Sequence, residues 1–139
     1  MSHRDISQRD RLKSVDREER YNLSDFEKIK KAYLPMTETA FYILLSLSEP
    51  RHGYGIAKFV SELTNGRIKL GSGTIYGTLT KMQRDHLIAV FDDSDKRVVY
   101  EITDNGKNIL NAEIARIKLI YSDAVSQESK FILDEGDMK

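Results

Sequence analysis

The sequence predicts a mainly α-helical fold with a small β-hairpin, arranged as a winged helix-turn-helix domain. Three observations lead to this prediction. Apolar side chains recur at Ile75, Leu79 and Met82, which is the spacing of one face of a helix. Residues 87–91 and 98–102 follow as two strand-like runs around a charged turn, the pattern of a hairpin. Two further helical patterns of apolar residues come before this helix.

The composition limits the class of protein. With 139 residues, of which 40% are hydrophobic, the chain is long enough for one domain with its own core. Basic and acidic residues number 22 each, so the net charge of zero gives no global signal for nucleic acid. The absence of cysteine excludes disulfides and thiolate metal sites. No apolar run approaches the ~20 residues of a spanning helix, and the charged N-terminus lacks a signal peptide's apolar stretch. We therefore expect no membrane association and a cytoplasmic location.

Residues 1–23 are expected to form a charged extension outside the domain. Acidic and basic residues alternate there and apolar residues are few, which is typical of a disordered or loosely helical segment. The alternative is a basic arm that reaches phosphates, although the interspersed acids weaken that idea. Ser24 and Glu27 form a capping-box pattern, so a short helix should begin here and end at Pro35. We expect the domain proper to span residues 24–103.

Two more helices are predicted in the first half of the domain. Thr37 is expected to cap a nearly all-apolar, buried helix that contains Ile43. Residues 49–53 read as a turn. A third, amphipathic helix follows and is expected to be ended by Thr64-Asn65-Gly66, in which Gly66 is a natural C-terminal glycine.

The next helix is expected to carry the function. Ser72 stands before it as the expected N-cap. Its outer face is small and polar at first, with Gly73, Thr74 and Tyr76, and turns basic at Lys81. A first turn with small hydroxyl-bearing side chains can approach a surface closely. Its free N–H groups and positive dipole end suit phosphate oxygens.

The strands after this helix predict a wing. Val90 is expected to turn inward on the first strand. Aspartate and serine residues between the strands favour a turn. Lys96 and Arg97 lie at the expected tip, where long cations can contact phosphate or the minor groove.

The last segment, residues 104–139, is expected to form a dimerisation helix and an acidic tail. Thr103 or Asp104 should cap this helix. Its apolar residues form a heptad-like stripe, which is typical of a helix that packs against a partner helix. The residues of this stripe are Leu110, Ile114, Ile117, Tyr121 and Ala124.

Four short motifs, taken in their order and spacing, resemble the PadR-like family of transcriptional regulators. They are His52-Gly53-Tyr54-Gly55, Gly73-Thr74-Ile75-Tyr76, Leu87-Ile88, and Arg97 through Tyr100 to Thr103 with Gly106. The resemblance runs from about Met36 to Tyr121. It implies a winged-helix DNA-binding domain, a C-terminal helix for dimerisation and, usually, repression of nearby genes. The family commonly has Ser-Pro-Gly-Thr at the helix start and a proline after the tyrosine. Gly71-Ser72-Gly73-Thr74 and Gly77 depart from that pattern, which leaves the base contacts open.

The expected contacts with double-stranded DNA follow from this resemblance and from the outer face described above. They are Tyr54, Ser72, Gly73, Thr74, Tyr76, Lys81, Lys96 and Arg97. Each has a structural alternative. Tyr76 could be an aromatic residue that packs on the wing, and Tyr54 could cap the core. The two wing cations could belong to a solvated turn, and Lys81 could be an ordinary surface cation.

Enzymatic and metal-dependent functions are not expected. His3, His52 and His86 have no metal-ligand spacing with carboxylates. The sequence has no nucleophile–histidine–acid arrangement, P-loop or dinucleotide fingerprint. We expect neither a metal nor a cofactor. The predicted function is a dimeric DNA-binding repressor, with a small apolar or aromatic effector as a further expected partner. The alternative is a winged-helix module that binds protein rather than DNA.

Overall fold

The computed structural model describes residues 25–93, 97–134 and 136. The chain divides into two compact units, Met1–Leu34 and Pro35–Lys139. In the first unit, residues 25–33 are helical, and this helix ends before Pro35 as predicted. The predicted extension over residues 1–23 and the capping residue Ser24 lie outside the described residues. The expected division at residues 24, 103 and 104 stays a prediction.

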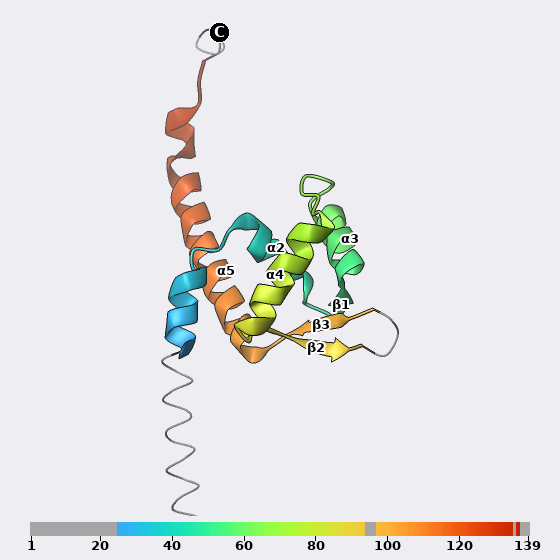
Figure 1. The fold of residues 1–139 in the computed structure, drawn as a ribbon. Coiled ribbons are helices and arrows are strands. Elements are labelled where there is room, and N and C mark those ends of the chain that lie inside the picture. Colours follow the sequence, from blue (N-terminus) through green and yellow to red (C-terminus); the bar gives the residue numbers. More distant parts are fainter. Residues whose placement is uncertain (1–24, 94–96, 135, 137–139) are drawn as a thin grey trace, which may run out of the picture. The chain divides into compact units, whose positions relative to one another are not determined.

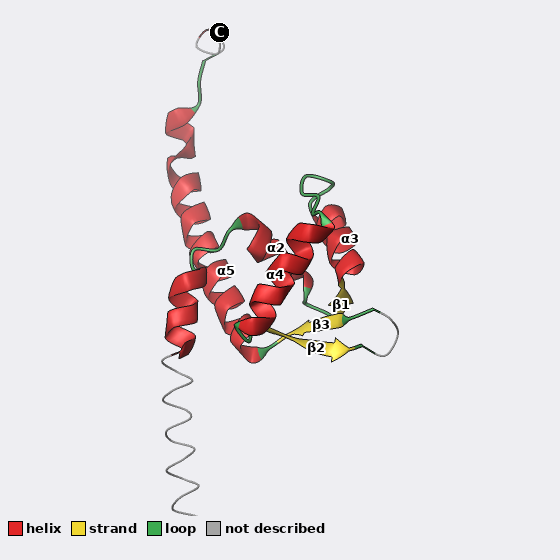
Figure 2. Ribbon diagram, viewed as in Figure 1, coloured by secondary structure: helices red, strands yellow, loops and turns green. Residues whose placement is uncertain are grey.

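The second unit combines helices with a three-stranded antiparallel sheet, as expected for a winged helix (Figures 1 and 2). Its fold therefore confirms the predicted class. The elements in chain order are α2 (Glu38–Ser46), β1 (Arg51–His52), α3 (Gly53–Leu63), α4 (Ser72–Arg84), β2 (Ile88–Asp92), β3 (Val99–Ile102), α5 (Asp104–Gln127) and the short 3-10 helix η1 (Glu128–Phe131).

Four helices and the start of β2 bury one apolar core. Thr37 caps α2 as predicted, because its hydroxyl accepts the N–H of Ala40 at 3.1 Å. The apolar spacing of each helix places its buried side chains on one side. The core residues of the second unit are Ile43, Leu44, Leu47, Ile56, Val60, Ile75, Leu79, Met82, Leu87, Ile88 and Ile109.

Helix α3 ends with a non-glycine residue in the left-handed conformation. Asn65 has φ 52° and its N–H bonds the carbonyl of Glu62, while the N–H of Gly66 reaches back to Ser61 at 2.7 Å. This is the Schellman pattern, in which the left-handed residue is usually glycine and sometimes asparagine. The helix is followed by Thr64-Asn65-Gly66 as predicted, and Gly66 also has a positive φ of 78°, but Asn65 rather than Gly66 is the first left-handed residue. His86 takes the same left-handed position after α4, with φ 62°.

The sheet contains a strand that the sequence did not predict. The segment expected to be a turn holds β1, whose Arg51 pairs with Tyr100 and whose His52 pairs with Val99 on β3. The strand order is therefore β1-β3-β2. A two-residue strand is too short to show alternation, so only the neighbouring strand defines it.

Strands β2 and β3 form the wing. Ile88 pairs with Ile102 and Val90 with Tyr100, after which a bulge shifts the register. Only Ile88 of this face is buried, whereas Val90 is 41% exposed. The prediction that Val90 turns into the core was wrong, because the wing extends beyond the part of the sheet that α4 covers.

The start of α5 is hydrogen-bonded to, and closely packed against, the turn between α4 and β2. The Thr103 hydroxyl accepts the N–H of Gly106 and donates to the carbonyl of His86 at 2.7 Å, so Thr103 is the cap, as one of the two predicted candidates. Gly106 is buried. A Cβ there would collide with the Leu87 carbonyl oxygen and lie 2.7 Å from Cγ1 of Ile102.

A buried carboxylate ties the segment before α2 to α5. Glu113 is 1% exposed and accepts the backbone N–H of Met36 and the Nε–H of Arg116. The bond from Arg116 lowers the pKa of Glu113, burial opposes this, and the Met36 bond lowers it further. Ionised Glu113 therefore stabilises the folded chain.

Gly106→Ala should lower the free energy of unfolding by about 1–3 kcal/mol, because the added methyl overpacks this contact. Urea denaturation followed by circular dichroism would measure it. Gly73→Ala is the matched control, since nothing lies within 4 Å of a Cβ at that position. Equal stability of the two variants would contradict the packing described for Gly106.

Glu113→Gln should cost about 1–3 kcal/mol at neutral pH by removing a charged hydrogen-bond acceptor. Since the folded-state pKa of Glu113 is lowered, its contribution is present above the unfolded pKa and lost as the pH falls through the folded one. The difference between parent and variant should therefore shrink below pH about 4. Urea melts across pH, with exposed Glu62→Gln as control, would test this, and a pH-independent difference would refute it.

Candidate nucleic-acid interface

Helix α4 is buried on one side only. Ile75, Leu79 and Met82 are at most 2% exposed and attach the helix to the core. At 100° per residue, the opposite side of α4 is centred on Gly73, Gly77 and Arg84. The exposed side chains there include two cations, and α4 contains no carboxylate. The exposed residues of this outer face are Gly73, Thr74, Tyr76, Gly77, Thr80, Lys81 and Arg84.

The glycines of this outer face have no role in packing. A Cβ at Gly71, Gly73 or Gly77 would meet nothing within 4 Å. A glycine inside a helix costs roughly 0.5–1 kcal/mol relative to alanine. The fold does not require glycine at these positions, although glycine makes the helix less stable. The glycines leave a strip of backbone along α4 that no side chain covers.

The start of α4 differs from the prediction in its cap. Gly71 is the N-cap, in an extended conformation (φ −77°, ψ 155°), and it makes no side-chain cap hydrogen bond. Ser72, which was predicted to cap, is the first helical residue, so its hydroxyl is past the position from which it could accept the N–H groups of the first turn. Ser72 and Thr74 are both exposed. The first turn therefore presents N–H groups and small hydroxyls at the positive end of the helix.

Tyr76 combines the two roles considered for it. Its side chain is 51% exposed, yet its ring lies over the backbone of Gly53, where a Cβ would be 2.6 Å from the hydroxyl oxygen. Burial raises the pKa of Tyr100 on β3, and the charge interaction with Tyr76 raises it further. Tyr76 thus packs where α3 meets the sheet and remains accessible to a ligand. Its DNA contact stays a prediction.

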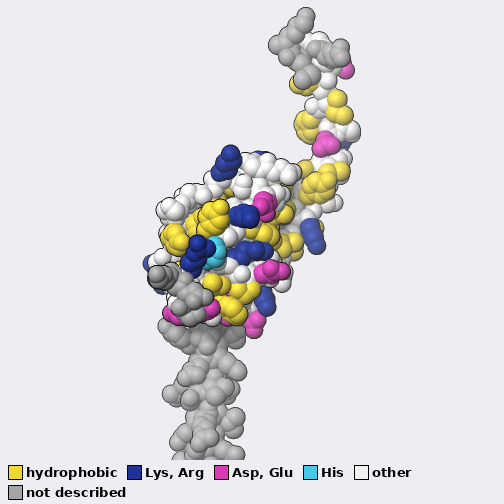
Figure 3. Space-filling view, turned by 90° about the vertical axis from the view of Figure 1, so that its right-hand side faces the viewer, with side chains coloured by type: hydrophobic (Ala, Val, Ile, Leu, Met, Phe, Trp, Pro, Cys, Tyr) yellow, Lys and Arg dark blue, Asp and Glu magenta, His cyan; other side chains and the backbone are white. Residues whose placement is uncertain are grey.

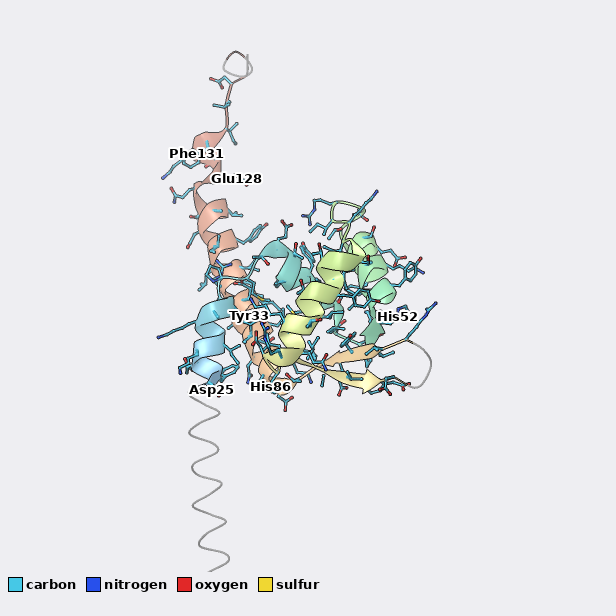
Figure 4. All side chains as sticks on the ribbon, in the orientation of Figure 1. Asp25, Tyr33, His52, His86, Glu128 and Phe131 are labelled. Atoms are coloured by element: carbon cyan, nitrogen blue, oxygen red, sulfur yellow. The ribbon has the colours of Figure 1, made fainter. Side chains whose placement is uncertain are left out.

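The first turn of α3 carries an exposed aromatic pair. Tyr54 is 72% exposed, so it does not cap the core. Its ring stacks on that of His52, with centroids 6.3 Å apart and planes at 16°. The pair lies at the junction of β1 and α3, where Figure 4 labels His52.

The wing places one cation against this junction. Arg97 is exposed, and its Nη1 lies 3.4 Å from Nε2 of His52. Lys96, the other predicted wing cation, lies outside the described residues. On the same side of the molecule, Figure 3 shows Lys and Arg side chains next to exposed hydrophobic ones and a histidine. His52 is the N-cap of α3, a role that was not predicted from the sequence, although His52 directly precedes the glycine with which the helix begins.

The predicted dimerisation stripe lies on a helix that leaves the core. Leu110 and Ile114 are half-buried, Ile117 is 40% exposed and Tyr121 is 70% exposed. From Lys118 onward every described residue of α5 is exposed. The sequence missed three exposed apolar residues outside the stripe: Leu119, Ile120 and Val125.

Neither a metal site nor a membrane-spanning helix is found in the described part of the chain. No group of three or more His, Cys, Asp or Glu side chains there could hold a metal ion. Among the described helices, none combines the length and apolar character needed to cross a membrane.

The second unit has the architecture of a winged helix-turn-helix, in which α3 and α4 are the two helices of the motif and the outer face of α4 is uncovered and free of carboxylates. The chain matches the transcriptional regulator PadR-like family over residues 42–112. That match covers half of the chain, so the protein belongs to this family. No curated protein gives a significant match.

Solved structures confirm the fold. A PadR family transcription regulator from hypervirulent Clostridium difficile has 24% identity and a TM-score of 0.55, covering 65% of this chain and 97% of that one. A PadR-like transcriptional regulator from Bacillus cereus has 24% identity and a TM-score of 0.54, covering 63% and 87%. A transcriptional regulator from Clostridium thermocellum has 20% identity and a TM-score of 0.56, covering 68% and 90%.

Proposed function

We propose that this PadR-like regulator is a homodimer that binds double-stranded DNA in a sequence-specific manner, with α4 in the major groove. The observation that carries this proposal is the outer face of α4, which exposes bare backbone, small hydroxyls and cations while the other face is buried. In helix-turn-helix proteins the second helix enters the major groove and its N-terminal residues contact the base edges. Helix α4 follows α3 in that order and has no carboxylate to repel phosphate.

The zero net charge does not oppose this proposal. Binding depends on the charge of the face that meets the DNA, and the exposed cations Lys81, Arg84 and Arg97 lie on α4 and the wing. Phosphate contacts by such cations make affinity fall steeply with salt. Repression rests on the family resemblance rather than on geometry.

Binding of the parent protein to a labelled duplex from upstream of its own gene tests the proposal. Fluorescence anisotropy at increasing salt should show tight binding with a steep salt dependence, and a random duplex of equal length should bind more weakly. A reporter fused to the same region should be less active when the protein is present. Binding to no duplex, or a flat salt response, would instead favour the protein-binding module.

An effector site stays a prediction. Two aromatic residues of α2 that could line such a site, Phe41 and Tyr42, contact each other edge to face with ring centroids 5.4 Å apart. The Tyr42 hydroxyl also accepts a hydrogen bond from Nη2 of Arg67 at 3.0 Å. These contacts support packing roles for both residues.

Gly77→Ala should change stability and DNA binding in opposite directions. Alanine should raise the free energy of unfolding by about 0.5–1 kcal/mol, because nothing obstructs its methyl and it favours the helix. The same methyl should hold α4 away from the groove and weaken binding to the upstream duplex. Thermal melts and anisotropy measure the two effects, with exposed Asn111→Ala on α5 as a control that should leave binding unchanged. If Gly77→Ala binds the duplex as tightly as the parent or more tightly, the outer face of α4 does not contact DNA.

Ile117→Glu should convert the dimer into monomers while helical content is kept. The carboxylate would be buried without a partner in the expected seam, which costs several kcal/mol. Leu119→Glu is the matched control, because residue 119 lies 200° further round the helix at 100° per residue. Light scattering at micromolar concentration would measure both. A monomeric parent, or dissociation by Leu119→Glu alone, would contradict the predicted stripe.

A further inference from the structure

His52 is held in one orientation by three neighbours. It is the N-cap of α3, and its Nδ1 accepts the N–H of Gly55 at 3.1 Å. Its ring stacks on Tyr54, and its backbone pairs with Val99 on β3. A side chain fixed by a cap, a ring and a strand presents its remaining nitrogen, Nε2, in a defined direction.

The cap bond determines where the imidazole carries its proton. Since Nδ1 accepts a hydrogen bond, the neutral ring must carry its proton on Nε2, and Nε2 is then a donor. Arg97 Nη1, 3.4 Å away, is also a donor. The two nitrogens therefore cannot bond each other. Both nitrogens present N–H groups to the same exposed space, where one acceptor can reach both.

We propose that His52 Nε2 and Arg97 Nη1 together form a binding site for one phosphodiester group of DNA. This inference rests on the proposed function and adds a recognition residue that belongs to neither α4 nor the wing. The phosphate oxygen accepts one neutral hydrogen bond from His52 and one charged hydrogen bond from Arg97. Phosphate contacts of this kind fix the register of a protein on the duplex without reading its sequence.

The tertiary structure supports an anion at this place. The pairing of β1 with β3 brings the N-terminus of α3 beside the wing, and the positive end of a helix dipole favours an anion. Arg97 is exposed and His52 is partly exposed, so a phosphate can reach both. Figure 4 shows His52 on the side of the molecule from which the wing projects.

The test uses a substitution that keeps the cap and removes the donor. Asparagine is among the best N-cap residues, and it is too short to replace Nε2, so His52→Asn should fold like the parent. His52→Asp is a second capping variant whose charge would repel phosphate. Arg97→Ala and the double variant His52→Asn/Arg97→Ala complete the set. Lys130→Ala, at the far end of the unit in η1, is the control for loss of a charge.

Anisotropy with the upstream duplex and with a random duplex should show about tenfold weaker binding of His52→Asn to both. Its salt slope should equal that of the parent, because a neutral donor releases no counterion. Arg97→Ala should instead reduce the slope by about one unit per lost contact. In the Arg97→Ala background, His52→Asn should cost clearly less than in the parent, since the two donors share one phosphate.

Two results would overturn the inference. If the parent binds DNA and both His52→Asn and His52→Asp bind like it, the phosphate site does not exist, although the proposed function survives. If the losses from His52→Asn and Arg97→Ala multiply independently, the two residues do not hold the same phosphate. A parent that binds no duplex contradicts the proposed function itself. Circular dichroism confirms folding, and His52→Asp decides the question should His52→Asn prove unstable.

Discussion

The burial of one face of α4 is the constraint on which the rest of the structure depends. Ile75, Leu79 and Met82 attach the helix to α2, α3 and the sheet, and burial of such side chains stabilises a fold by about 1.5–3 kcal/mol each. The same attachment leaves the opposite face accessible. After α4, the left-handed residue His86 turns the chain directly into β2. Core packing thereby sets both the direction of α4 and the origin of the wing.

The short pairing of β1 with β3 is the second constraint. Without it, the first turn of α3 and the wing would be separate surface features. With it, His52, Tyr54 and Arg97 lie together, and Tyr76 of α4 packs on Gly53 beside them. The absence of a Cβ at Gly53 leaves room for the Tyr76 ring, because a Cβ there would lie 2.6 Å from the Tyr76 hydroxyl oxygen and the ring would have to shift. The two-residue strand β1 therefore brings exposed side chains of α3, α4 and the wing together on one surface.

The glycines of the described chain differ in the space around them. Gly106 is required by close packing against the backbone of Leu87, Gly53 makes room for the Tyr76 ring, and Gly73 and Gly77 face open space. Glycine inside α4 lowers the stability of the helix without a packing reason and leaves its backbone uncovered. Under the proposed function, that uncovered backbone is what allows close approach to DNA. The buried face of α4 then provides the stability that the glycines do not.

The sequence by itself determined the helices, the hairpin and the outward face of α4, because these depend on periodicity along a continuous segment. It also determined the caps Thr37 and Thr103, whose partners are three residues away. Only the tertiary structure decided the features that depend on residues distant in the chain. These include the strand β1, the buried Glu113 that bonds Met36, the exposure of Val90, and the approach of His52 to Arg97. A side chain that is 45 positions from its neighbour leaves no periodic signal, so its role emerges only when packing brings the two segments together.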